Sequence, residues 1–329
     1  MRNATILSTG AAAPEQVISN QFFNELLGED VDTWLRERVN IHERRWLTAE
    51  QSVSDLCVAA AGQAMERAGI TASDLDLIII ATDTPEFISP STASVVQHRL
   101  GASHAGTFDL NTACAGFVTA LDTASAFIRS HARYDYILVV GAYGMSKYLN
   151  LSDKKTVTLF ADGAGAVILG ATDQSGTGYL ASHLHTLGHY HDGMGIFAGG
   201  TKIPVTPEVL AAKDHLLKFV YKFPPELNPQ QWSEIAIHLC EETGMTPGDV
   251  SQYFFTQINI NSIRETLDRL HQPHEKAHTI MDRYGYPGSA CIPMAFDEAI
   301  QQGKVAKGDV VMFIGSGGGL AFAGAAFRM

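Results

Sequence analysis

The stretch Asp109-Leu110-Asn111-Thr112-Ala113-Cys114-Ala115-Gly116-Phe117 leads from an extended segment to a single cysteine, after which small residues open a helix. Apolar residues spaced three to four apart between Ala115 and Ile128 predict that helix. Cys114 is therefore expected beside a helix N-terminus, where free N–H groups and the helix dipole lower the pKa of a thiol. The stretch predicts a nucleophile. A small buried core residue is the alternative, since free cysteine is among the most buried residue types.

Motifs that recur in the same order predict two similar halves. The paired segments are 68–75 with 243–250, 136–141 with 309–315, and 162–169 with 317–325. Three ordered matches at comparable intervals indicate an internal duplication. The all-apolar run Leu77–Ala81 is typical of a strand buried on both faces, and strands alternate with helical patterns along the chain. These features predict a layered α/β architecture.

Composition narrows the classes of function. The chain has 329 residues, of which 46% are hydrophobic, and a net charge of -12, which argues against a nucleic-acid or membrane-surface binder. Its four scattered cysteines show neither metal-site spacing nor a disulfide framework, which fits the reducing cytoplasm. The first residues lack a signal-peptide pattern, and no apolar run is long enough to span a membrane. We therefore expect a cytoplasmic globular protein without membrane insertion.

Three motifs together carry a family resemblance: residues 111–117 around Cys114, residues 159–166, and Gly317-Gly318-Gly319. Their order and spacing resemble β-ketoacyl-acyl carrier protein synthase III of the thiolase superfamily. The resemblance implies a five-layered αβαβα thiolase fold with halves at residues 1–172 and 173–329, and a homodimer. It also implies that a CoA or acyl-carrier-protein thioester acylates Cys114 without a cofactor or metal. The N–H groups of Cys114 and Gly318 would then form an oxyanion hole.

Two catalytic positions depart from the family pattern. The family has a His-Gln-Ala-Asn motif and a Gly-Asn-Thr-Ser turn, whereas the matching segments here read Thr256-Gln257-Ile258-Asn259 and Gly285-Tyr286-Pro287-Gly288. Gln257 thus takes the His position and Tyr286 the Asn position. Both can still donate hydrogen bonds to a thioester oxygen. A carboxamide cannot act as a base, and a phenol is a poor one at neutral pH, so any base must come from elsewhere.

The resemblance also assigns substrate-binding positions. Trp34 and Arg38 match residues that clamp the adenine end of CoA, although Trp34 could also be a packing residue. Lys154 or Lys155 falls where the family tends to have an arginine, and Lys154 and Asn259 are assigned to the same predicted site. Phe87 and Ser89 lie in a loop that, in the family, reaches the acyl pocket of the partner subunit. Residue size there would set the accepted chain length.

Four histidines, at positions 183, 185, 189 and 191, form a dense run beside Asp192. A metal site is one interpretation. The flanking Gly188 and Gly193 suggest a loop, and the family commonly has a similar stretch without metal. One of these histidines could alternatively supply a base.

Three functions remain. The preferred hypothesis is an acyltransferase that loads Cys114 and passes the acyl group to a second substrate, in fatty-acid-like, polyketide or secondary-metabolite biosynthesis. The second is an ordinary decarboxylative ketosynthase in which Gln257 and Tyr286 replace the usual donors. The third is a weakly catalytic subunit paired with an active homologue, against which the intact Cys114 turn argues.

Overall fold

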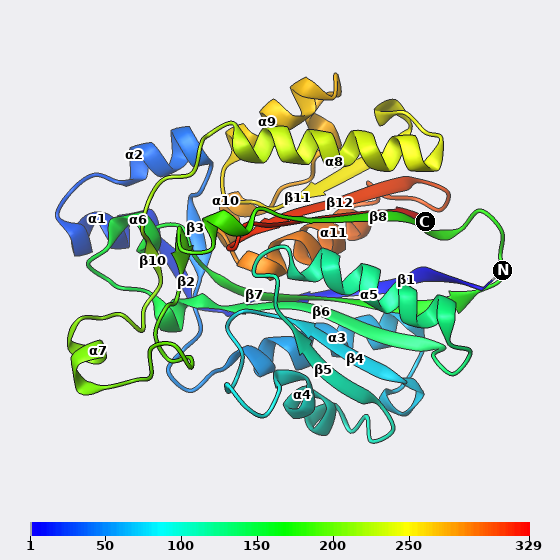
Figure 1. Ribbon diagram of the computed structural model, residues 1–329, viewed down its shortest axis with the longest axis horizontal. Helices are drawn as coiled ribbons and strands as arrows, with labels where there is room; N and C mark the ends of the chain where they lie inside the picture. Colours follow the sequence, from blue (N-terminus) through cyan, green and yellow to red (C-terminus); the bar gives the residue numbers. More distant parts are fainter. Residues whose placement is uncertain (1) are drawn as a thin grey trace.

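The computed structural model describes residues 2–329, whose main strands form two sheets (Figure 1). The first sheet has the order β1 (Asn3–Ala12), β7 (Asp162–Thr172), β6 (Tyr136–Gly144), β4 (Leu77–Ala81) and β5 (Gly106–Leu110). The second has the order β8 (Gly178–Thr186), β13 (Ala321–Arg328), β12 (Val310–Gly317) and β11 (Gln252–Phe255).

The two sheets repeat one topology. In the first, β1, β7 and β6 are antiparallel neighbours, and β6, β4 and β5 are parallel. In the second, β8, β13 and β12 are antiparallel, and β12 and β11 are parallel. A parallel bridge between Tyr253 and Ala277 lies where β5 lies in the first sheet. The predicted duplication is confirmed, while the boundary between residues 172 and 173 stays a prediction.

Six main helices complete the layers: α3 (Val53–Ala68), α4 (Thr92–Leu100), α5 (Gly116–Ser130), α8 (Leu227–Thr243), α9 (Ile260–Arg269) and α11 (Cys291–Gln301). Helix α5 contacts strands of both sheets, and so does α11. Helices α3 and α4 cover the outer face of the first sheet, and α8 covers that of the second, with α9 packed beside it. Figure 1 shows the resulting five layers, with α8 and α9 at the top and α3 and α4 at the bottom. The predicted five-layered αβαβα fold is confirmed.

Local sequence explains the bounds of α3. The Ser52 N–H donates to the Asp55 carboxylate at 2.7 Å in a capping box, and Gly69 ends the helix in the left-handed conformation, with a φ of 68°. Ser52 is therefore the N-cap. The Ser54 hydroxyl accepts a hydrogen bond from Arg99 at 2.8 Å, which ties α3 to α4.

Shorter elements gather mainly at one end of the layers (Figure 1). They are β2 (Val17–Ser19), α1 (Asn20–Leu27), α2 (Asp32–Trp34), β3 (Glu43–Arg45), α6 (Lys154–Val157), β9 (Met194–Gly195), α7 (Pro207–Ala211), β10 (Lys218–Phe219) and α10 (Met281–Tyr284). Among residues 2–329, no helix combines the length and apolar character needed to cross a membrane.

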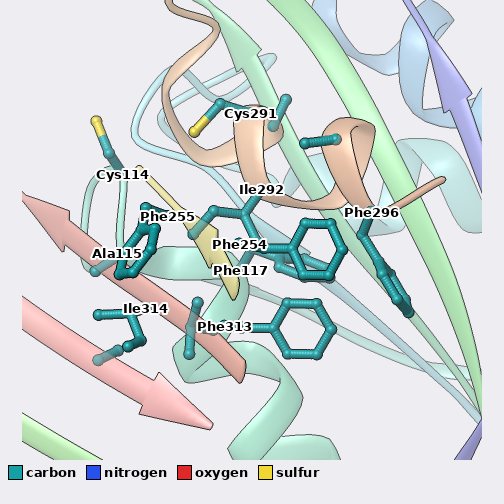
Figure 2. Packing of buried hydrophobic residues seen from close by; sticks show 14 of the residues in the cluster. Cys114, Ala115, Phe117, Phe254, Phe255, Cys291, Ile292, Phe296, Phe313 and Ile314 are labelled. Atoms are coloured by element: carbon teal, nitrogen blue, oxygen red, sulfur yellow. The ribbon is translucent and has the colours of Figure 1, made fainter. Parts of the chain in front are cut away.

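Aromatic rings join the two halves beneath the cysteine turn (Figure 2). The Phe313 ring of β12 lies 4.9 Å from Phe296 of α11 and 6.2 Å from Phe117 of α5, between ring centroids. All three side chains are fully buried. Truncating one such ring to alanine typically costs about 3–5 kcal/mol. This cluster therefore fixes the position of α5, and with it the turn that carries Cys114.

Candidate active site

The carboxyl ends of three strands of the first sheet lie together at the candidate site. Because β6, β4 and β5 are parallel neighbours, their carboxyl ends meet at the same edge of the sheet. Asp83 follows β4, Cys114 follows β5, and Tyr143 lies near the end of β6. The second half supplies Gly317 at the end of β12 and Gln257 just beyond β11. The candidate site thus lies where the two halves meet.

The turn that carries Cys114 is tightly specified. The Asn111 side chain accepts a hydrogen bond from the Ala113 N–H at 2.9 Å, and the Ala115 N–H donates to the Thr112 carbonyl at 3.1 Å. Ala113 has a φ of 48°, which a residue with a Cβ rarely adopts. Helix α5 begins two residues after Cys114. The predicted position beside a helix N-terminus is confirmed, and the strained residue precedes the candidate nucleophile directly.

The Cys114 thiol is buried between two phenols. Burial raises its pKa well above the ordinary value, and the negative charge of Asp83 raises it further. Hydrogen bonding by Tyr286 and Tyr143 acts in the opposite direction and favours the thiolate. The sequence-based expectation of a lowered pKa is therefore wrong for the free chain, because loss of water around the sulfur outweighs the favourable groups.

Gly317 lies against the cysteine turn. A Cβ added to Gly317 would lie 2.6 Å from the Cys114 amide nitrogen and 2.6 Å from the Thr112 carbonyl oxygen. Only glycine permits this approach of the two backbones. Gly318 follows immediately and lines a cavity together with Ala113. The chain from the second half therefore lies beside the Cys114 amide.

Tyr286 is held in place by its backbone. Its N–H donates to the Leu159 carbonyl at 2.9 Å, and its carbonyl accepts from the Ala161 N–H at 3.1 Å. Its ring packs on Phe160 at 5.3 Å between centroids, and the side chain is almost fully buried. Burial raises the pKa of Tyr286 well above its ordinary value. The phenol is therefore neutral and available as a donor toward Cys114.

Gln257 has different partners from those expected. Its side chain is fully buried, its amide nitrogen donates to the His278 carbonyl at 3.3 Å, and its amide oxygen accepts from the Ile280 N–H at 2.8 Å. Both ends of the carboxamide are thus engaged by one backbone segment. Its neighbour Thr256, by contrast, lines a cavity beside Tyr286.

A large pocket of about 760 Å³ brings together three of the predicted substrate-binding residues, Trp34, Lys154 and Asn259. It continues inward to a small cavity of about 80 Å³ lined by Tyr286 and Gly317. The residues lining both are Phe219, Phe223, Pro224, Asn228 and Ile258. A mainly apolar passage therefore leads from the outer pocket to Tyr286 and Gly317.

The predicted substrate-binding residues differ in exposure and in whether their side chains already have partners. The Trp34 side chain is 50% exposed, which disfavours a packing role. The Lys154 ammonium pairs with Glu29 at 2.9 Å, and Asn259 caps α9 by accepting from the Asn261 N–H. Arg38 is exposed, and its guanidinium does not line the described pocket, although its carbonyl accepts from the Asn261 side chain at 2.6 Å.

The loop that carries Phe87 and Ser89 lies on the surface. Phe87 is 53% exposed and Ile88 is 86% exposed, and none of the described cavities includes them. The loop is anchored by Glu86, whose carboxylate accepts from the Ser52 hydroxyl at 3.0 Å. A single chain therefore does not bring Phe87 or Ser89 to Cys114.

The histidine run divides between two elements. His183 and His185 lie in β8 rather than in a loop, and the His183 ring packs on His238 at 4.5 Å. His191 follows the 3-10 helix η4 (Gly188–Tyr190) and lines a cavity with Tyr143 and Gly318. Within residues 2–329, no group of three or more His, Cys, Asp or Glu side chains is arranged to hold a metal.

Sequence reasoning did not single out Asp83, Tyr143 or Cys291 as site residues. Asp83 and Tyr143 lie near the carboxyl ends of parallel strands. This position in the sequence is the feature that could have identified them as site residues. Cys291 begins α11, the counterpart of α5 in the second half, and its sulfur lies at the same edge of the aromatic cluster as that of Cys114 (Figure 2). Burial raises the pKa of Cys291 to about 12.

Two family descriptions match the chain: 3-oxoacyl-(acyl-carrier-protein, ACP) synthase III over residues 108–188, and the C-terminal part of that synthase over residues 240–329. The beta-ketoacyl-(acyl-carrier-protein) synthase III of Clostridioides difficile is 36% identical over 321 residues, covering 96% of this chain and 95% of that protein. The acetoacetyl CoA synthase NphT7 of Streptomyces sp. is 37% identical, covering 96% and 95%. The crystal structure of 3-oxoacyl-(acyl-carrier-protein) synthase III from Aquifex aeolicus superposes with a TM-score of 0.89 at 31% identity, covering 99% of this chain and 100% of that structure.

Proposed function

The chain belongs to the 3-oxoacyl-ACP synthase III family, and from this premise we propose that it is an acyltransferase with an acyl-Cys114 intermediate. The donor is an acyl-CoA or an acyl-carrier-protein thioester, and the acyl group passes to a second substrate. One observation carries the proposal. The Cys114 thiol lies between the Tyr286 and Tyr143 hydroxyls, and Tyr286 also lines the small cavity to which the outer pocket leads.

Acylation uses the backbone around the cysteine. The Cys114 and Gly318 N–H groups form the oxyanion hole, which the close approach of Gly317 to the Cys114 amide supports. Such donors stabilise the tetrahedral intermediate of thioester attack, and losing one costs about 10²–10³ in rate. The thiol proton leaves with the thiol of CoA or of the carrier protein, so this step needs no additional base.

Cys114, Gln257 and Tyr286 occupy the positions of the family's cysteine, histidine and asparagine, with Cys114 and Tyr286 as catalytic residues and Gln257 as a positioning residue. Tyr286 acts as a hydrogen-bond donor to the acyl-enzyme, which its neutral, buried phenol supports. Gln257 contributes chiefly by fixing the backbone at His278 and Ile280, because both ends of its amide are engaged there. Neither residue is a base.

The outer pocket receives the donor. Trp34 offers an exposed ring for stacking, and Lys154, Lys155 and Lys222 bring positive charge to the same pocket. Asn259 also lines this pocket, and Arg38, which lies outside its lining, is assigned to the same donor. The lysines suit the phosphates of CoA or of a carrier-protein arm, since each ammonium is a compact charge with three donors.

A homodimer completes the acyl pocket. The exposed apolar side chains of Phe87 and Ile88 support a contact with a second copy, in which Phe87 and Ser89 close the partner's acyl pocket. Two-fold dimers are the commonest oligomers, and an exposed apolar loop tip is disfavoured in an isolated chain.

Decarboxylative condensation with a malonyl thioester is the second candidate, because relatives that match nearly the whole chain are named as a beta-ketoacyl-(acyl-carrier-protein) synthase III and an acetoacetyl CoA synthase. In that case Tyr286 would donate to the developing enolate. Pairing with an active homologue is the third candidate, and the intact Cys114 turn disfavours it.

Intact-mass spectrometry of the isolated protein tests these candidates. Incubation with a series of acyl-CoA and acyl-ACP donors should add one acyl mass, which peptide mapping should locate at Cys114. Cys114→Ala should lose the adduct, and Cys291→Ser, the matched change at the neighbouring buried thiol, should keep it. A parallel assay follows CO₂ release from malonyl-CoA and malonyl-ACP. Release at the rate of acyl transfer would favour the ketosynthase. No adduct from any donor would overturn the acyltransferase proposal.

A further inference from the structure

His278 lies between the 3-10 helix η6 (His274–Lys276) and α10, on the segment that leads to Tyr286. Its side chain is only 6% exposed, and both ring nitrogens have partners. The Nε2 atom lies 2.9 Å from the Glu298 carboxylate of α11, and the Nδ1 atom lies 3.0 Å from the Lys304 ammonium in the turn after α11. The buried ring is therefore placed between an anion and a cation.

The two partners determine which ring nitrogen carries the proton. An ammonium group has three N–H donors and no acceptor, so Lys304 must donate to the Nδ1 atom of His278. Nδ1 is therefore unprotonated, and the proton of the neutral ring is on Nε2, which donates to Glu298. Protonation of the ring would turn an Nδ1–H toward the ammonium, donor against donor. The geometry thus requires a neutral ring in the Nε2–H form.

The charged groups around the ring also balance only while it is neutral. Arg283 of α10 donates to the two Glu298 oxygens at 2.8 and 2.9 Å, and to the Asp282 carboxylate at 3.3 Å. Two cations, Arg283 and Lys304, thus face two carboxylates, and an imidazolium would add a third cation without a partner. Burial lowers the pKa of His278 from its ordinary value of 6.5, and Lys304 and Arg283 lower it further, although Glu298 opposes them.

The segment that carries His278 is fastened at several points before it reaches Tyr286. The His278 carbonyl accepts from the Gln257 amide at 3.3 Å. Glu298 binds the segment twice, through the His278 ring and through the Arg283 guanidinium. Tyr286 follows Arg283 by three residues, and its hydroxyl is a hydrogen-bond partner of the Cys114 thiol. A displacement at His278 is therefore transmitted toward the phenol.

We propose that His278 is a positioning residue for Tyr286: its neutral ring, held between Glu298 and Lys304, fixes the segment that carries the phenol. Protonation of the ring in acid displaces Lys304 and moves the segment, so removal of the acyl group from Cys114 slows. The inference rests on the proposed function, because it requires Tyr286 to donate to the acyl-enzyme. His278 lines none of the described cavities and acts only through Tyr286.

Nitrogen-15 NMR of the full chain, labelled at its histidines, tests the protonation state. At about pH 8, the His278 signals, assigned by their loss in His278→Gln, should show the proton on Nε2. Lys304→Met should move protonation of the ring to a higher pH, because it removes the facing cation. Lys307→Met, which removes an exposed lysine outside this cluster, should leave the titration unchanged. An imidazolium or an Nδ1–H ring at about pH 8 would overturn the inference.

Carbon-13 labelling of the tyrosine ring carbon that bears the hydroxyl reports on Tyr286. Its signal, assigned with Tyr286→Phe, should move as His278 takes up a proton between about pH 7 and about pH 5. The signal should stay fixed over that range in His278→Gln, because glutamine keeps a donor and an acceptor but cannot be protonated. His274→Gln, which changes an exposed histidine paired with Asp268, should titrate as the parent does.

Hydrolysis of butyryl-Cys114, with water as the acceptor, gives the rates, and intact mass follows the loss of the acyl group. At about pH 8, His278→Gln should react within about threefold of the parent, whereas His278→Ala should be slower by about tenfold or more. Acid should slow the parent relative to His278→Gln in step with protonation of His278. Acylation by butyryl-CoA should stay within about threefold of the parent in both variants.

The outcomes separate this inference from the proposed function. The positioning role is overturned if the Tyr286 signal does not follow protonation of His278, or if His278→Gln slows in acid as the parent does. A parent that no donor acylates overturns the proposed function instead. In that case the Tyr286 signal still decides whether His278 positions the phenol.

Discussion

The amide oxygen of Gln257 accepts a hydrogen bond from the Ile280 N–H at 2.8 Å, while its amide nitrogen donates to the His278 carbonyl. One fully buried side chain thereby clamps three consecutive residues that lead into α10 and on to Tyr286. An imidazole has only one ring nitrogen free to donate and one to accept in its neutral form, with a different spacing from a carboxamide. The Gln257 amide thus holds the backbone of residues 278–280 and is not directed at the cavity.

Gln257→Ala should therefore act mainly on stability. Two buried backbone groups would lose their partners and a cavity would remain, at a cost of roughly 2–4 kcal/mol in the free energy of unfolding. Gln257→Glu, which keeps an acceptor for Ile280 but sets a buried carboxylate against the His278 carbonyl, should cost at least as much. Urea unfolding gives the free energies, and single-turnover acylation gives the rates. A stable Gln257→Ala variant with selectively slow transfer would show instead that the amide contacts substrate.

Tyr286→Phe should slow transfer from acyl-Cys114 by about 10²-fold, because it removes a buried donor and keeps the ring. Acylation should stay near the parent rate. Rapid-quench mass spectrometry separates the two steps. Tyr284→Phe is the matched control: that ring lies under the guanidinium groups of Arg45 and Arg283 and outside the described cavities. Equal slowing of both steps in Tyr286→Phe would contradict the assignment.

Arg44 should be important for the stability of the site. It is fully buried and donates to the Ile18 carbonyl, the Asn20 side chain and the Thr158 carbonyl. Arg44→Lys keeps the charge but cannot serve three acceptors with one geometry, so we expect a loss of roughly 2–4 kcal/mol in the free energy of unfolding. Arg36→Lys, in an exposed pair with Asp32, should change stability by less than about 1 kcal/mol. Comparable denaturation midpoints for the two variants would refute this role.

Asp83→Asn should stabilise the chain in a pH-dependent way. The pKa of Asp83 is about 6 in the folded state and 3.8 in the unfolded chain. Between these two pH values, only the folded state holds the proton. The free energy of unfolding therefore falls as pH rises from about 4 to 6, and the loss is complete above pH 6. Removing the charge should thus gain roughly 3 kcal/mol at pH 8 and little at pH 4.

Asp162 provides the contrast for that measurement. Burial also raises the pKa of Asp162 to about 6, but its carboxylate accepts from the Leu47 N–H at 2.7 Å and the Ser146 N–H at 2.8 Å. Asp162→Asn should therefore lower the melting temperature at pH 8, since an amide nitrogen would face one of these donors. An Asp83→Asn variant that melts below the parent at pH 8 would indicate that the carboxylate has a structural partner.

Sedimentation should show a particle of about twice the 35.5 kDa chain mass. Phe87→Ala should extend the longest accepted acyl chain, since each buried methylene contributes about 0.8 kcal/mol. Leu184→Ala, which truncates an exposed apolar residue on β8, should leave chain-length preference unchanged. A monomer at micromolar concentration, or a preference unaffected by Phe87→Ala, would rule out the shared pocket.

Much of the fold was readable in the sequence because each half is a regular alternation of elements. The apolar run Leu77–Ala81 became the fully buried β4, and Gly69 ended α3 where its left-handed conformation is required. The position of Cys114 beside α5 also followed from local spacing. These features depend on neighbours in the chain, and periodicity and turn chemistry report such neighbours directly.

The electrostatics of the site depend on contacts distant in sequence, and local patterns do not report them. The pKa of Cys114 is set by burial between the halves and by Asp83, which lies 31 positions earlier in the chain. Likewise, Gln257 looked like a free donor because nothing near it in sequence identifies His278 and Ile280 as its partners. The divided histidine run has the same origin: strand pairing with β13 placed His183 and His185 in a sheet.

The candidate site combines residues of both halves, so it is complete only when the whole chain has folded. Cys114 comes from the first half, whereas Gly317 and Tyr286 come from the second, and Gly317 reaches the Cys114 amide only when β12 is in place. On the proposed function, a nascent chain that has emerged only through β7 carries Cys114 without the Gly318 N–H and the Tyr286 phenol. Acylation would then require the second sheet to be in place.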